Sequence, residues 1–85
     1  MAYAIEFAPS AKRELHKLPR DLQLKLNQRI DSLSIEPRPR GSKKLKGATE
    51  LWRIRVGDYR VVYEVRDKIL VVLVVRVAHR REVYR

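Results

Sequence analysis

Three strand-like runs that follow one another almost without a gap constrain this chain most. They are Leu51 to Val56, Tyr59 to Arg66 and Ile69 to Val77, with two residues between each run and the next. Gly57-Asp58 favours a type II′ hairpin turn, because glycine readily adopts the positive φ that its first central position requires. Asp67-Lys68 is a weaker turn signal. The runs therefore predict a three-stranded antiparallel meander.

A two-residue turn fixes which residues face each other across a hairpin. The first turn places Arg55 opposite Arg60 and Arg53 opposite Val62. Alternation then sends one apolar set toward a core, namely Trp52, Ile54, Val56, Tyr59, Val61 and Tyr63. The other face collects the three arginines with Val62 and Glu64. Like charges directly opposite each other destabilise a sheet, so water screens this face or an anion binds to it.

The third run is apolar on both faces, which is typical of a central strand covered on both sides or of a groove floor. A two-residue second turn predicts Arg60 opposite Val75, on the face that also carries Leu73 and Val77. A basic tail follows the run and contains His79, Arg80, Arg81 and Tyr84.

The first part of the chain predicts one strand and two helices. Alternation from Tyr3 to Phe7 indicates a short strand with Tyr3, Ile5 and Phe7 inward. A helix starts near Pro9, ends at Pro19 and carries an apolar stripe of Ala11, Leu15 and Leu18. A second helix starts near Arg20 or Asp21, ends before Pro37 and carries Leu22, Leu26, Ile30 and Leu33. We expect one α+β domain over residues 1–85, with the helical hairpin packed on one face of the sheet.

The segment from Pro37 to Gly47 is predicted to be a loop. It carries five positive charges and no negative charge. It is either a solvated connector or an arm that contacts phosphates through Lys43, Lys44 and Lys46.

Charge and composition limit the possible functions of the chain. The chain has 20 Lys+Arg against 10 Asp+Glu, a net charge of +10, which favours a nucleic acid partner over an acidic protein or a membrane surface. It has no cysteine and only two histidines, in different elements, so we expect no metal and no cofactor. The N-terminus lacks a signal-peptide pattern, and the longest apolar run is too short to span a bilayer, so we expect a cytoplasmic protein without a membrane partner.

Four segments resemble the RelE branch of the RelE/ParE toxin superfamily. They are MAYAIEF at the start, LKG at Leu45 to Gly47, WRIRVGDYRVVYEV from Trp52, and VAHRREVYR at the end. The resemblance covers essentially the whole chain and includes the order of the elements. It implies a RelE-like fold and the toxin of a type II toxin–antitoxin pair.

The resemblance also implies an activity and partners. RelE-like toxins are ribosome-dependent, metal-independent endoribonucleases that cut mRNA in the A site, leave a 2′,3′-cyclic phosphate and a 5′-hydroxyl, and so inhibit translation. The implied partners are the ribosome with its mRNA and a cognate antitoxin, RelB-like and acidic, which blocks the toxin and with it represses operator DNA. Two alternatives remain: a ParE-like toxin that inhibits DNA gyrase without nuclease residues, and a passive nucleic-acid-binding module.

Site residues follow from the resemblance position by position. Arg53 and Arg55 fall where RelE itself carries two lysines, and Arg60 matches the arginine of its GYR-type motif. Arg80 or Arg81 matches the arginine of the terminal motif, and Tyr84 matches its tyrosine.

These side chains suit phosphodiester cleavage. Guanidiniums stabilise a phosphorane through two phosphate oxygens, and Tyr84 can stack on a base. Arg55 is a poor general base, because arginine keeps its proton at ordinary pH. His79 is the candidate for proton transfer, because imidazole titrates near neutrality and related toxins use a histidine in this tail.

Each of these residues also has a purely structural interpretation. Arg53 and Arg55 would be solvated charges on a half-exposed strand, and Arg60 would pair with Glu64. His79 would cap the end of the sheet, and Tyr84 would anchor the tail in the core.

Overall fold

The computed structural model describes residues 2–47 and 50–83. For residues 82 and 83 it describes the backbone alone. Its elements are β1 (Ala4–Phe7), α1 (Pro9–His16), α2 (Arg20–Ser32), β2 (Lys43–Lys44), β3 (Leu51–Val56), β4 (Tyr59–Arg66), β5 (Val71–His79) and α3 (Arg80–Val83). The predicted α+β class and helical hairpin are confirmed. Two short elements were not predicted: β2, in the segment expected to be a loop, and α3, in the basic tail.

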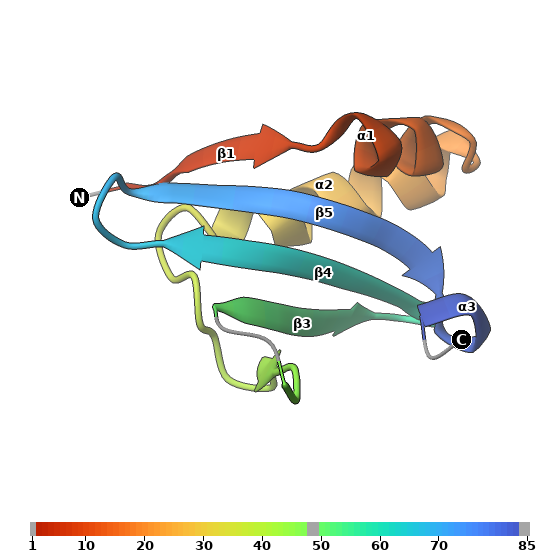
Figure 1. Cartoon of the computed structure of the whole chain (residues 1–85). Coiled ribbons are helices and arrows are strands. Elements are labelled where there is room, and N and C mark those ends of the chain that lie inside the picture. The colour runs from red at the N-terminus through yellow and green to blue at the C-terminus, as the bar shows by residue number, and fades with distance from the viewer. Residues whose placement is uncertain (1, 48–49, 84–85) are drawn as a thin grey trace.

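The strands form one mixed sheet in the order β1-β5-β4-β3-β2 (Figure 1). Strand β1 runs parallel to β5, and the other neighbouring pairs are antiparallel. Strand β5 therefore lies inside the sheet, as its apolar sequence predicted. Strand β2 extends the sheet by two residues, with Lys43 opposite Arg53 and Lys44 opposite Trp52.

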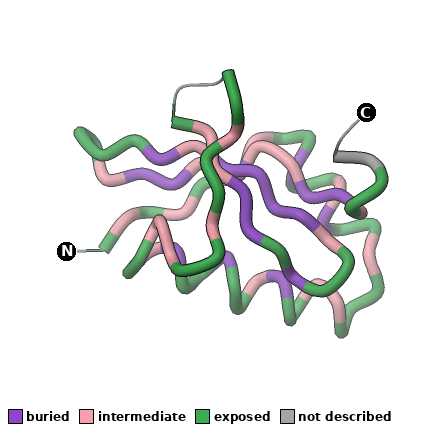
Figure 2. The backbone as a smooth tube through the Cα atoms, turned by 90° about the horizontal axis from the view of Figure 1, so that it is seen from below, coloured by how far each residue is buried: buried purple, intermediate pink, exposed green. Residues whose placement is uncertain are grey.

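The two long helices cover one face of the sheet (Figure 1). Pro9 stands at the start of α1, where a missing N–H costs nothing, and Pro19 separates α1 from α2. The predicted apolar stripes are buried in the core through Ala11, Leu15, Leu26, Ile30 and Leu33. Buried residues concentrate in the central strands, whereas turns and the segment before β2 are more exposed (Figure 2).

The β3–β4 hairpin has the predicted register. Arg55 pairs with Arg60, and Arg53 pairs with Val62. Gly57 has a φ of 61°, a value that glycine adopts without steric cost. The apolar set of the hairpin packs against the helices, as the alternation predicted.

The predicted register of the β4–β5 hairpin is wrong. Arg66 pairs with Val71, so Asp67 to Leu70 form a four-residue connection, and Leu70 has a φ of 55°. A register shift between Val62 and Tyr63 then leaves Val75 as an extra residue in β5. As a result Arg60 faces Ala78 rather than Val75.

The same shift moves Val77 to the other face. Val77 pairs with Val61 and belongs to the hydrophobic core. Leu73 pairs with Glu64 and remains on the face that carries the arginines, as predicted.

Within residues 2–47 and 50–83, no helix is long and apolar enough to cross a membrane.

The buried stripe of α2 generates a stability prediction. Ile30 is fully buried, whereas Leu24 on the same helix is 56% exposed. We expect Ile30→Ala to lower the free energy of unfolding by about 2–5 kcal/mol, because it removes core contacts and leaves a cavity. The control Leu24→Ala should change it by less than about 0.5 kcal/mol. Urea denaturation measures both, and equal effects would contradict this packing.

Candidate nucleic-acid interface

The sheet face opposite the helices carries a row of cations. Neighbours that pair directly across strands point to the same side of a sheet. The pairing of Lys43 with Arg53, of Arg53 with Val62, and of Val62 with Arg76 therefore makes one row, and the pairing of Arg55 with Arg60 makes the next. We call this surface the arginine face; its cations are Lys43, Arg53, Arg55, Arg60 and Arg76. Arg66 lies on the same side at the far end of β4, where it pairs with Glu64.

Two of these arginines are buried. Arg53 and Arg60 are each 5% exposed, whereas Arg55 is exposed. Within the described part of the chain, Nη1 of Arg53 is buried without a hydrogen-bond partner. Holding a guanidinium out of water is costly unless an anion or acceptor lies against it. The burial excludes the interpretation of Arg53 as a solvated surface charge.

Glu64 is the acidic residue of β4 that lies closest to the arginines, and it pairs with a different residue. Glu64 forms an ion pair with Arg66 on its own strand. Glu64, which the structural interpretation paired with Arg60, therefore pairs with Arg66 instead. Arg55 and Arg60 lie directly opposite each other, as the hairpin register predicted.

The structure divides the three loop lysines. Lys43 lies on the arginine face, opposite Arg53. Lys44 pairs with Trp52, whose ring packs against the core, so its side chain leaves from the other side of β2. Lys46 is exposed in the turn after β2. Lys43 alone of these three therefore extends the arginine face.

His79 lies on the helix side of the sheet, away from the arginine face. It pairs with Tyr59, and their rings meet edge to face with centroids 5.5 Å apart. Nδ1 of His79 accepts the backbone N–H of Arg81 at 3.3 Å, so the proton of a neutral His79 is on Nε2. The side chain therefore caps the first turn of α3 and lines a cavity of about 260 Å³ beside α1.

The terminal arginines lie at the end of the sheet where Arg55 and Arg60 pair. The backbone N–H of Arg80 donates to the carbonyl of Asp58 in the β3–β4 turn at 2.8 Å. Arg80 and Arg81 are both exposed. Tyr84 lies outside the described residues, so its predicted stacking role stays a prediction.

Sequence reasoning missed Glu14 and Arg76. Carboxylate Oε1 of Glu14 accepts the backbone N–H of Val77 at 2.9 Å, and Oε2 lies 3.5 Å from Nε of Arg76. Glu14 thus satisfies a strand N–H beyond the point where β1 stops pairing with β5. Arg76 joins the arginine row only because of the register shift, which no sequence pattern signals.

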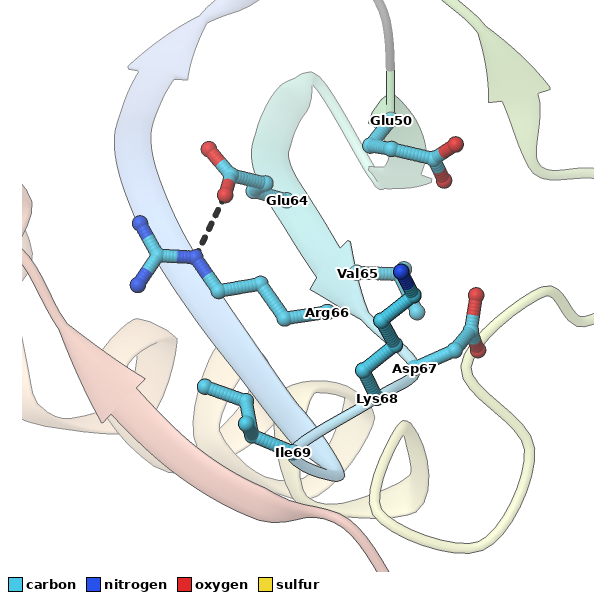
Figure 3. Close-up of a pocket in the computed structure, with 7 residues that line it drawn as sticks. All are labelled: Glu50, Glu64, Val65, Arg66, Asp67, Lys68 and Ile69. Carbon is cyan, nitrogen blue, oxygen red and sulfur yellow. Dashed lines mark hydrogen bonds and ion pairs between the residues drawn. The ribbon is translucent and has the colours of Figure 1, made fainter.

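A second cavity, of about 430 Å³, lies at the far end of β4 (Figure 3). Its ionisable side chains include the Glu64–Arg66 pair and Asp67, which binds Arg38. Three carboxylates and two cations line this cavity, so it is less suited to phosphate than the arginine face.

Comparisons with known proteins agree with this geometry. The profile of the family described as "ParE toxin of type II toxin-antitoxin system, parDE" matches residues 5–84. Toxin RelG of Mycobacterium tuberculosis is 35% identical, over 100% of this chain and 99% of its own. The mRNA interferase toxin RelE of Escherichia coli K12 is 33% identical, over 99% of this chain and 92% of its own.

Solved structures show the same fold. The toxin–antitoxin complex RelBE2 of M. tuberculosis aligns with a TM-score of 0.82 and 32% identity, over 93% of this chain and 99% of the matched chain. The archaeal RelE–RelB complex of Pyrococcus horikoshii aligns with a TM-score of 0.83 and 31% identity, over 96% and 99%.

Proposed function

Because the chain belongs to the RelE/ParE family of type II toxins, we propose that it is a ribosome-dependent endoribonuclease that cleaves mRNA in the A site and inhibits translation. The observation that carries the proposal is the pair of buried guanidiniums, Arg53 and Arg60, beside the exposed Arg55 on one open sheet face. The naming of an E. coli relative as an mRNA interferase supports the same activity.

The proposed reaction is an internal transesterification. The 2′-oxygen attacks the adjacent phosphorus, its proton is lost, the bond to the 5′-oxygen breaks, and that oxygen takes up a proton. The products are a 2′,3′-cyclic phosphate and a 5′-hydroxyl. Negative charge grows on the phosphorane oxygens, where the fixed guanidiniums of Arg53 and Arg60 would stabilise it.

Further basic and aromatic residues have supporting roles in this proposal. Arg55 and Lys43 would bind neighbouring phosphates, and Arg80 or Arg81 would approach the substrate from the end of the sheet. Tyr84 would stack on a base. The proposed partner is a RelB-like antitoxin, since related toxins have been solved in complexes with RelB antitoxins. We expect this antitoxin to be acidic, because the toxin carries a net charge of +10, and the toxin would reach operator DNA only within that complex.

Programmed ribosomes test the proposed activity. We expect cleavage of an mRNA held with its codon in the A site, and little or no cleavage of the same RNA without ribosomes, because the arginine face supplies no acid–base pair of the kind a free ribonuclease uses. A gyrase supercoiling assay runs in parallel. Equal cleavage of both RNAs would exclude ribosome dependence, and gyrase inhibition without mRNA cleavage would favour the ParE-like alternative.

Arg60 tests the chemistry of the arginine face. We expect Arg60→Met to reduce single-turnover cleavage on the ribosome by roughly 10²–10³, the usual effect of losing one preorganised donor. Methionine keeps most of the buried volume without the charge. Arg60→Lys should restore only part of the rate, because lysine lacks the planar fork.

The matched control is Arg66→Met, since Arg66 is an exposed arginine on the same strand. It should cleave at the wild-type rate. A folded Arg60→Met variant with undiminished activity would remove Arg60 from the mechanism.

Two substitutions of His79 distinguish a role in helix capping from a role in proton transfer. Its contact with the Arg81 N–H supports a role in positioning α3. We expect His79→Asn to keep most of the cleavage rate, because asparagine caps helices well, and His79→Ala to lose more of it. Loss of roughly 10²–10⁴ in both variants, together with the loss of one limb from the pH–rate profile, would instead assign His79 to proton transfer.

A further inference from the structure

Arg38 is bound within the protein, although it belongs to the basic segment before β2. Its Nη2 lies 2.8 Å from Oδ2 of Asp67, and its Nη1 donates to Oδ1 at 3.2 Å, so the guanidinium grips both carboxylate oxygens. Nη2 also lies 3.4 Å from Glu50. The guanidinium sits 5.3 Å from the centre of the Trp52 ring, within the range of a cation–π contact. The charge of Arg38 is therefore engaged in contacts within the protein rather than with a phosphate.

Asp67 is the centre of this cluster. Besides Arg38 it accepts a hydrogen bond of 2.6 Å from the hydroxyl of Tyr3, just before β1. The hydrogen bonds from Arg38 and then from Tyr3 lower the pKa of Asp67 to about 2. The carboxylate is therefore ionised throughout the pH range in which the protein would act.

Arg38 and Asp67 anchor the segment before β2 together with Tyr63. The hydroxyl of Tyr63 donates to the carbonyl of Pro37 at 2.7 Å, directly before Arg38. Downstream, β2 has only two residues paired with β3, followed by the bond from the Leu45 N–H to the Leu51 carbonyl at 2.9 Å. A two-residue edge strand is weak alone. An anchor elsewhere in the segment would therefore help to hold Lys43 beside Arg53.

We propose that Arg38 and Asp67 form a latch that positions the segment 39–46 so that Lys43 joins the arginine face as a phosphate contact. Arg38 and Asp67 are positioning residues that act through Lys43. The expected effect of the latch on RNA binding rests on the proposed function. Its effect on the stability of β2 can be measured without RNA.

The substitution Asp67→Asn distinguishes the latch from a simple effect of charge, because the two predict opposite changes in KM. The substitution raises the positive charge of the protein by one, which by charge alone would strengthen binding to mRNA on the ribosome. The latch predicts the opposite, a rise in KM of roughly fivefold with little change in kcat. The control Asp31→Asn makes the same change of charge at an exposed position of α2 and should not raise KM.

A double-mutant cycle tests the path through Lys43. Lys43→Ala should raise KM and reduce the slope of log affinity against log salt by about 1, as expected for one lost phosphate contact. Adding Asp67→Asn to Lys43→Ala should then have no further effect, because the two residues act as one unit. Fully additive effects would overturn the proposal.

Hydrogen exchange of the Leu45 amide provides the readout that needs no RNA. We expect faster exchange in Asp67→Asn and in Arg38→Met than in the wild type or in Asp31→Asn, with unchanged exchange in β4 and β5. Unchanged exchange at Leu45 would overturn the latch even in an active toxin. Faster exchange in a protein that cleaves no mRNA would keep the latch and reject the proposed function.

Discussion

The register of the β3–β4 hairpin is the constraint on which the rest of the structure depends. It places Ile54, Val56, Val61 and Tyr63 against the helices and thereby sends Arg53, Arg55 and Arg60 to the other side. Side chains alternate strictly along a strand, so a slip of one residue would turn the arginines into the core and the apolar set into water. The core therefore enforces the crowding of like charges. Hydrophobic burial on one face offsets the repulsion between like charges on the other.

The same hairpin also holds the end of the chain. The carbonyl of Asp58 in its turn accepts the N–H of Arg80, and Tyr59, the first residue after the turn, meets the ring of His79. Helix α3 begins at this point and carries Arg80 and Arg81 to the end of the sheet where Arg55 and Arg60 pair. The imidazole of His79 lies on the helix side and the guanidiniums of the row lie on the open side, so the sheet separates the two.

The parts of this arrangement that were predictable from sequence have a local physical cause. Gly57 marks a tight turn, and alternation on both sides of it fixes the faces, so the β3–β4 register was correct. The β4–β5 register was not, because Leu70 adopts a positive φ that leucine rarely signals. The bulge at Val75 lies in a run of apolar residues, where alternation carries no information about faces. Arg38 looked like one of five loop charges, since its partner Asp67 is remote in sequence and the ring of Trp52 was expected only in the core.

Burial of arginine rather than lysine in this row limits what the face can contribute to catalysis. A lysine held out of water can release its proton, whereas an arginine stays charged, so Arg53 and Arg60 would stabilise a phosphorane without accepting the 2′-hydroxyl proton. Under the proposed function, the protein then contributes electrostatic stabilisation, and the alignment of the 2′-oxygen with its leaving group must come largely from how the RNA is held. A ribosome fixes an A-site codon in one conformation, whereas free RNA samples many. Under the proposed function, dependence on the ribosome would thus follow from a face that offers charge and position but no base among its cations.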